Sequence, residues 1–213
     1  MKFLDLFLHL DATLGSAIAT YGGWIYGALF AVIFCETGLV VTPFLPGDSL
    51  LFAAGAFAAS GALNLWVVWV LLFAAAVLGD GVNYRIGLKI GARILETGKL
   101  AGVPIKKEYI AKTQSYYDRY GAKTIVLARF MPFLRTFAPF VAGVGRMRAS
   151  VFSFYNVIGA AAWVSLFVFG GYFFGNVPIV KKNFEIVIFA IIFISVLPAL
   201  FEVIKQGRSN RRA

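Results

Sequence analysis

Two arginines lie inside residues 128–145, a stretch that is otherwise apolar enough to enter a membrane. Arg129 and Arg135 are separated by Pro132, which interrupts any continuous helix. On one straight helix their side chains would point about 240° apart, whereas a reversal of the chain brings them together. An intramembrane charge costs about 3 kcal/mol and usually faces the protein interior or a wet cavity. We predict a re-entrant hairpin over residues 125–145; the alternative is a kinked span with snorkelling arginines.

Two acids accompany a second interruption near the N-terminus. Glu36 lies deep in an apolar run over residues 24–42, and Asp48 follows Pro43, Pro46 and Gly47, which cannot continue a helix. The apolar arm beyond this break has about 12 residues, too few to cross a hydrocarbon core of about 30 Å. Residues 24–60 are therefore predicted to form a first re-entrant hairpin.

Each acid has a functional and a structural interpretation. A buried carboxyl group near a cation can titrate at neutral pH, as proton coupling requires, so Glu36 is a candidate proton carrier. The alternative for Glu36 is a static ion pair with Arg129 or Arg135. Asp48 can cap the following helix, and Asp80 is interpreted as a capping or interfacial carboxylate at the end of a span.

The two arginines and the two breaks together favour an anion. Helical arms beginning near Asp48 and Thr136 would direct free amides and positive dipole ends toward the middle of the membrane. Guanidinium groups bind phosphate through two parallel hydrogen bonds. We therefore hypothesise a site for a phosphate headgroup, with the acyl or prenyl chains left in lipid.

The whole composition is typical of a membrane protein. Of 213 residues, 60% are hydrophobic and 14% charged, and the mean hydropathy is +0.82. The net charge of +10 is concentrated in residues 81–148, as in basic loops that set topology rather than bind nucleic acid. Cys35 is the only cysteine and His9 the only histidine, so we predict neither a metal site nor a cofactor.

We predict an all-α integral membrane protein with two oppositely oriented re-entrant hairpins, about three full transmembrane helices and amphipathic surface helices. Pro43-Phe44-Leu45 and Pro132-Phe133-Leu134 match as an inverted repeat would. The single membrane domain, 1–213, then divides into an interfacial helix (1–20), hairpin 1 (24–60), a transmembrane helix (63–80), a basic cytoplasmic amphipathic section (82–124), hairpin 2 (125–145), two further transmembrane helices (151–175 and 184–204) and a basic tail (205–213).

Three ordered motifs resemble the signatures of the DedA membrane-protein family. They are Glu36-Thr37-Gly38 with Pro43-Phe44-Leu45-Pro46-Gly47-Asp48, then Gly79-Asp80 with Tyr84, and Arg129-Phe130-Met131-Pro132-Phe133-Leu134-Arg135-Thr136 with Pro139. The resemblance implies that Glu36, Asp48, Arg129 and Arg135 are essential. Supporting positions are Pro43, Pro46, Gly47, Asp80, Tyr84, Pro132, Thr136 and Pro139, while Tyr84 and Trp163 also suit packing or an interfacial belt.

The resemblance further implies a bacterial inner-membrane protein, proton-dependent transport and movement of lipid-linked phosphates. We expect a proton-coupled flippase whose partners are an anionic phosphate-headed lipid, protons, the membrane and possible copies of itself, with no nucleic acid. One alternative is a proton-coupled small-ion exchanger. A remote one is an intramembrane aspartyl hydrolase, because Asp48 and Asp80 both follow glycine.

Overall fold

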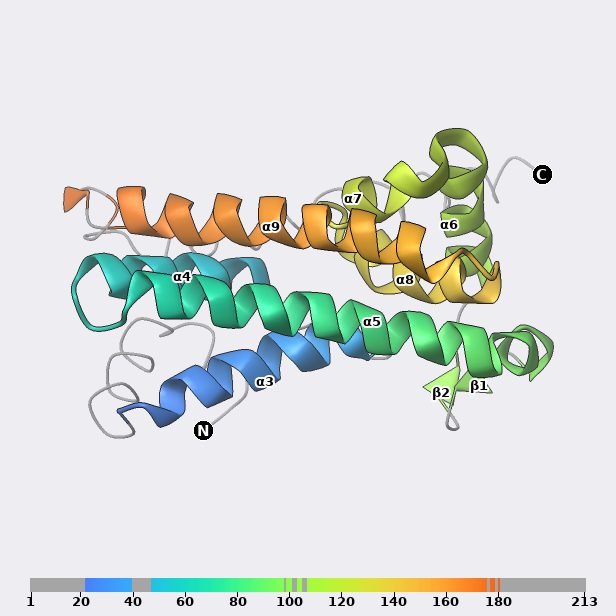
Figure 1. Cartoon of the computed structure of the whole chain (residues 1–213), viewed down its shortest axis with the longest axis horizontal. Coiled ribbons are helices and arrows are strands. Elements are labelled where there is room, and N and C mark those ends of the chain that lie inside the picture. The colour runs from blue at the N-terminus through green and yellow to red at the C-terminus, as the bar shows by residue number, and fades with distance from the viewer. Residues whose placement is uncertain are drawn as a thin grey trace, which may run out of the picture. The chain divides into compact units, whose positions relative to one another are not determined.

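A computed structural model describes residues 22–39, 47–97, 99–100, 103–104, 107–175, 177–178 and 180. The elements are α3 (Trp24–Gly38), α4 (Gly47–Ala59), α5 (Leu65–Thr97), β1 (Lys99–Leu100), β2 (Val103–Pro104), α6 (Lys107–Tyr120), the 3-10 helix η1 (Gly121–Lys123), α7 (Thr124–Ala128), α8 (Pro132–Val144) and α9 (Ala149–Phe174) (Figure 1). Except for the short antiparallel pair β1–β2, these elements are helical, which confirms the predicted helical class. The expectations for 1–20, 184–204 and 205–213 lie outside the described residues.

Two described helices are long and apolar enough to cross a membrane, over Leu65–Gly91 and Ala149–Phe174. The second agrees closely with the predicted segment 151–175. The first does not, because α5 passes through Gly79 and Asp80 without a break and ends at Thr97. The predicted end of this helix at residue 80, and the start of a separate amphipathic section at residue 82, are therefore wrong.

Among the described residues, one compact unit comprises 22–32, 47–73 and those from 164 onward. In it, Asn64 caps α5 by accepting hydrogen bonds from the amides of Trp66 (3.0 Å) and Val67 (3.1 Å). Trp69 Nε1 donates to Ser165 Oγ at 3.0 Å, which joins α5 to α9 within this unit. Short helix α4 begins at Gly47, so Asp48 lies inside its first turn and not at the cap position expected for it.

The other unit comprises residues 33–39 and the described residues within 74–163. Helices α6 and α7 pack against α8 (Figure 1). The core of this unit contains Ile110 of α6 with Phe137, Phe140 and Val141 of α8. Helix α8 also approaches α5 so closely that a Cβ at Gly87 would collide with the Phe140 carbonyl group. This close packing holds α8 against the C-terminal half of α5.

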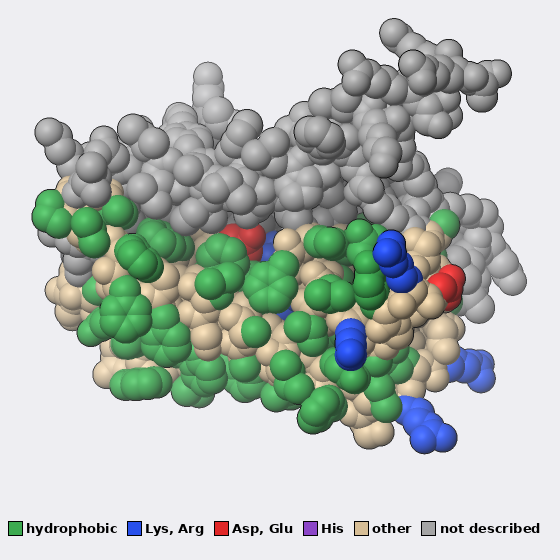
Figure 2. All heavy atoms as spheres, turned by 90° about the horizontal axis from the view of Figure 1, so that it is seen from above, with side chains coloured by type: hydrophobic (Ala, Val, Ile, Leu, Met, Phe, Trp, Pro, Cys, Tyr) green, Lys and Arg blue, Asp and Glu red, His purple; other side chains and the backbone are tan. Residues whose placement is uncertain are grey.

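Helix α9 carries much exposed apolar surface. Its exposed large side chains are Phe154, Val157, Ile158, Leu166, Phe173 and Phe174. Figure 2 shows hydrophobic side chains spread across one face of the molecule. Such a surface is unusual for a soluble protein and suits contact with lipid chains.

Candidate functional site

The break predicted at Pro132 is present. Helix α7 ends at Ala128, and α8 begins at Pro132, which occupies a first-turn position where its missing amide hydrogen costs nothing. Met131, which precedes it, has an extended backbone. The N-terminus of this arm is therefore at Pro132, and the expectation that it lies near Thr136 is wrong. Pro139 lies inside α8.

Arg129 lies in this break and is buried, with 2% of its surface exposed. Its Nη2 atom donates hydrogen bonds to Asp80 Oδ2 and, at 2.6 Å, to Asn156 Oδ1. Asn156 is itself fixed, because its Nδ2 donates to the Val77 carbonyl at 3.1 Å. Gly159 leaves room for the arginine, since a Cβ there would lie 3.3 Å from Arg129 Nε.

Asp80 was expected to be a capping or interfacial carboxylate, and that expectation is wrong. It is 3% exposed, lies in the continuous helix α5 and forms an ion pair with Arg129. Its neighbour Gly79 has no room for a Cβ, which would collide with the Thr37 hydroxyl group and the Phe34 carbonyl. The glycine therefore allows α3 to approach α5 closely beside the ion pair.

Arg135 forms a second ion pair. Its Nη2 donates to Glu36 Oε1 of α3 at 2.5 Å, and both residues are buried. An ion pair of Glu36 with Arg129 or Arg135 was the expected alternative to a proton carrier, and Arg135 is the partner. Each arginine thus faces its own carboxylate, and the formal charges of these four side chains cancel.

Both arginines contact the ring of Trp163. Its indole is fully buried, and the Cζ atoms of Arg129 and Arg135 lie 5.7 Å and 5.0 Å from the ring centroid. Such cation–π contacts contribute about 0.5–2 kcal/mol each. The two arginines are therefore close together, as expected, and both contact the ring of Trp163, which was expected to serve packing or an interfacial belt.

Asn83 links α3 and α8 through hydrogen bonds. Its Nδ2 donates to the carbonyl groups of Thr37 at 3.2 Å and Thr136 at 2.8 Å. Thr37 lies at the end of α3, and Thr136 lies in α8. Asn83 and Asn156 were both missed as site residues; the available signal was an amide side chain inside an apolar helix.

In Arg129, Asp80 and Asn83, four buried polar atoms make no hydrogen bond within the part of the chain that the structure describes. They are Arg129 Nε, Arg129 Nη1, Asp80 Oδ1 and Asn83 Oδ1. An unsatisfied buried group costs about 1–3 kcal/mol, more when charged. The cluster therefore retains hydrogen-bonding capacity for water or a ligand.

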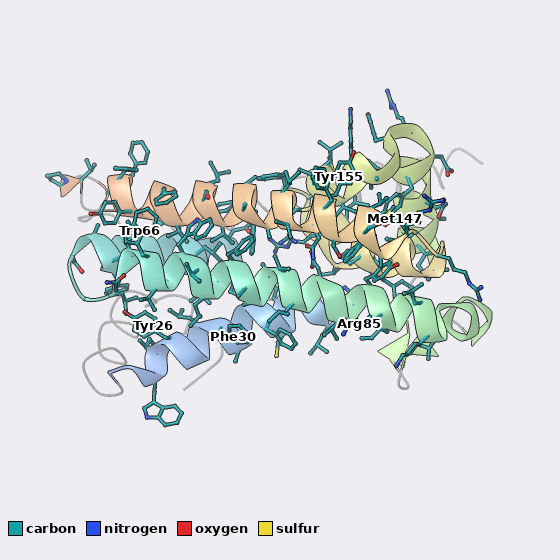
Figure 3. All side chains as sticks on the ribbon, viewed as in Figure 1. Tyr26, Phe30, Trp66, Arg85, Met147 and Tyr155 are labelled. Carbon is teal, nitrogen blue, oxygen red and sulfur yellow. The ribbon has the colours of Figure 1, made fainter. Side chains whose placement is uncertain are left out.

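The remaining predicted positions divide into three groups. Tyr84 is a packing residue: its ring stacks on Phe152 at 4.2 Å, and its hydroxyl donates to the carbonyl of Met147, labelled in Figure 3. Gly47 and Asp48 belong to the other compact unit. Pro43 and Pro46 lie outside the described residues. Among the residues that the structure describes, no group of three or more His, Cys, Asp or Glu could hold a metal ion.

Comparisons with known proteins give one consistent family. The VTT domain matches residues 45–173, a range that contains both arginines and Asp80 but not Glu36. Protein DedA of Escherichia coli is 49% identical over 212 residues, covering 99% of this chain and 96% of that protein. An uncharacterized membrane protein of Mycobacterium tuberculosis is 39% identical (92% and 86% covered), and inner membrane protein YghB of Escherichia coli is 34% identical (87% of each). No solved structure matches the chain.

Proposed function

This chain belongs to the VTT-domain, or DedA, family of membrane proteins, and on that premise we propose that it moves a phosphate-headed lipid between leaflets in a proton-coupled cycle. The relatives include a protein named as an inner membrane protein. We accordingly propose the bacterial inner membrane as its location, with a polyprenyl phosphate or a phospholipid as its substrate.

The observation that carries this proposal is the buried cluster of Arg129 and Arg135 with Asp80 and Glu36. Two guanidinium groups near one another suit a phosphate headgroup, because each offers planar pairs of donors. The carboxylates that compensate these cations can take up a proton and become neutral. The apolar surface of α9 suits the tails of a lipid.

The proposed architecture places the two breaks in the membrane as re-entrant hairpins. Helices α4 and α8 have 13 residues each, or about 20 Å, which is too short to cross a core of about 30 Å. Helices α5 and α9, with residues 184–204, would then supply three full crossings. Opposed hairpins would let the site open to each side in turn.

Labelling of single cysteines tests the second hairpin. In a Cys35→Ala background, Lys123→Cys and Arg148→Cys should both react with an impermeant reagent from the cytoplasmic side, because both exposed positions flank one re-entrant segment. Ala62→Cys should react only from the opposite side. Reaction of positions 123 and 148 from opposite sides would replace the hairpin with an ordinary crossing.

Binding measurements test the substrate. The purified protein should bind a polyprenyl phosphate more tightly than the matching polyprenol by about one to two powers of ten, since a charge-assisted hydrogen bond contributes about 1.5–3 kcal/mol. The preference should vanish in the double variant Arg129→Ala/Arg135→Ala. Lipid flux in liposomes, with and without a pH gradient, extends the test to transport.

A proton-coupled small-ion exchanger is the competing function. The observation that favours it is the pairing of both arginines with carboxylates, as in a purely structural network. Equal binding of polyprenyl phosphate and polyprenol would support this function against the lipid transporter. Asp80 faces Arg129 rather than a second aspartate, which is unlike the acid pair of an aspartyl hydrolase.

A further inference from the structure

The hydrogen bonds of Arg129 leave neither fork of its guanidinium group complete. An arginine presents two forks to an oxyanion, Nε with Nη2 and Nη1 with Nη2, so Nη2 belongs to both. In this structure Nη2 donates to Asp80 Oδ2 and Asn156 Oδ1. Nε and Nη1 make no hydrogen bond within the described residues. A phosphate therefore gains two parallel bonds only when Asp80 or Asn156 releases Nη2.

Asp80 is the partner that a phosphate would displace. Asn156 is neutral and remains anchored through the Val77 carbonyl. Asp80 carries the same sign of charge as the phosphate, and two anions at one cation repel each other. Its second oxygen, Oδ1, is buried and makes no hydrogen bond among the described residues, so less holds Asp80 in place.

The surroundings of Asp80 determine what happens to its charge. The charged or titratable groups within electrostatic reach are Arg129 beyond α7, Arg135 of α8 and Tyr117 of α6, while Glu36 of α3 acts on Arg129. Helix α9 contributes the neutral Asn156 and Trp163. Once a phosphate compensates Arg129, the 3%-exposed Asp80 loses its main counter-ion. An ionised carboxylate without a partner is costly at such a place.

We propose that Asp80 is a displaceable counter-ion of Arg129: a phosphate headgroup takes its place, and Asp80, as it is released, takes up a proton that the buffered solution supplies. The inference rests on the proposed transport of a phosphate-headed lipid. It adds a proton that is taken up on binding, distinct from the proton assigned to Glu36, and it makes Asn156 the residue that keeps Arg129 in position during the exchange.

Calorimetry of the purified full-length protein with a polyprenyl phosphate measures this proton. Titrations in buffers with different heats of ionisation give the protons taken up per bound lipid, at a pH where the free phosphate monoester is fully ionised. Asp80→Asn should take up about one proton fewer per lipid than the unmutated protein. Its affinity should stay equal or increase, because the competing carboxylate is gone.

Asp118→Asn is the matched control, since Asp118 is an exposed acid on α6 that accepts a hydrogen bond from Gln114. It should show the unmutated proton count. An equal proton count in Asp80→Asn, or a large loss of its affinity, would overturn the inference. Failure of the unmutated protein to bind the phosphate lipid at all would instead reject the proposed function.

Infrared difference spectroscopy gives a measurement that does not depend on the folding of Asp80→Asn. Binding of the polyprenyl phosphate to the unmutated protein should produce the carbonyl band of a protonated carboxyl group. The band should remain in Glu36→Gln and should not appear with the matching polyprenol. Binding without this band, or a band lost in Glu36→Gln, would contradict protonation of Asp80.

Discussion

Arg135→Ala is expected to abolish lipid transport and to lower the free energy of unfolding by about 3–5 kcal/mol, because it leaves Glu36 charged in a buried place without its cation. Denaturation in detergent and lipid flux in liposomes measure the two effects. Arg148→Ala is the matched control: this arginine is exposed just before α9, so both quantities should change little. A stable Arg135→Ala protein would mean that the ion pair contributes little to folding.

A double variant separates the structural role of Arg135 from its role in transport. Glu36→Gln/Arg135→Gln removes both charges, so it should regain most of the lost stability without regaining transport. Arg135→Lys keeps the charge but lacks the planar fork, and should rescue transport poorly. Transport by the double variant would reduce the Glu36–Arg135 pair to a structural contact.

Glu36→Gln alone is expected to weaken strongly the response of lipid transport to a pH gradient while the protein still inserts. The glutamine can still accept the hydrogen bond that Arg135 Nη2 donates to Glu36 Oε1, but it has no titratable proton. The flux of a polyprenyl phosphate lipid, with and without an imposed pH gradient, measures the effect.

The control for Glu36 is Asp118→Asn, which removes an exposed acid and should leave the gradient response intact. If Glu36→Gln kept a normal response, proton coupling would have to pass through another acid, with Asp80 the first to test. The two acids can therefore be told apart by different measurements. Substitution of Glu36 is expected to change the response of transport to a pH gradient, and substitution of Asp80 the number of protons taken up when the lipid binds.

The sequence predicted those elements whose evidence is local. Apolar length placed α9 within two residues of its observed bounds, Ala149–Phe174. The basic amphipathic section predicted over residues 82–124 contains the helix α6, Lys107–Tyr120. Pro132 predicted the break between α7 and α8, because a proline in a helix interior loses a hydrogen bond wherever the rest of the chain lies.

The end of α5 was mispredicted for a physical reason. Gly79-Asp80 is a common way to end a helix, since glycine is flexible and an aspartate favours water. Here both residues serve tertiary contacts: Gly79 admits α3, and Asp80 meets Arg129. Neither contact can be read from neighbouring residues, because Asp80 and its partner lie far apart along the chain.

The charged residues of the site were likewise predicted from the sequence, but the contacts between them were not. Arg129, Arg135 and Glu36 were recognisable because charged residues in apolar sequence are costly and seldom accidental. Which carboxylate faces which arginine depends on how α3, α5 and α8 pack. The same packing gives Asn83 and Asn156 their carbonyl partners, which no spacing in the sequence indicates.

The indole shared by the two guanidinium groups gives the protein a built-in optical reporter. Trp163 is one of four tryptophans, and the other three are Trp24, Trp66 and Trp69. With those three replaced by phenylalanine, the tryptophan fluorescence would come from Trp163 alone. Its ring lies close to the guanidinium groups of both Arg129 and Arg135. Indole emission responds to nearby charge, so departure of either arginine would change its colour or intensity. Events at the ion pairs can thus be followed in real time without attaching a dye.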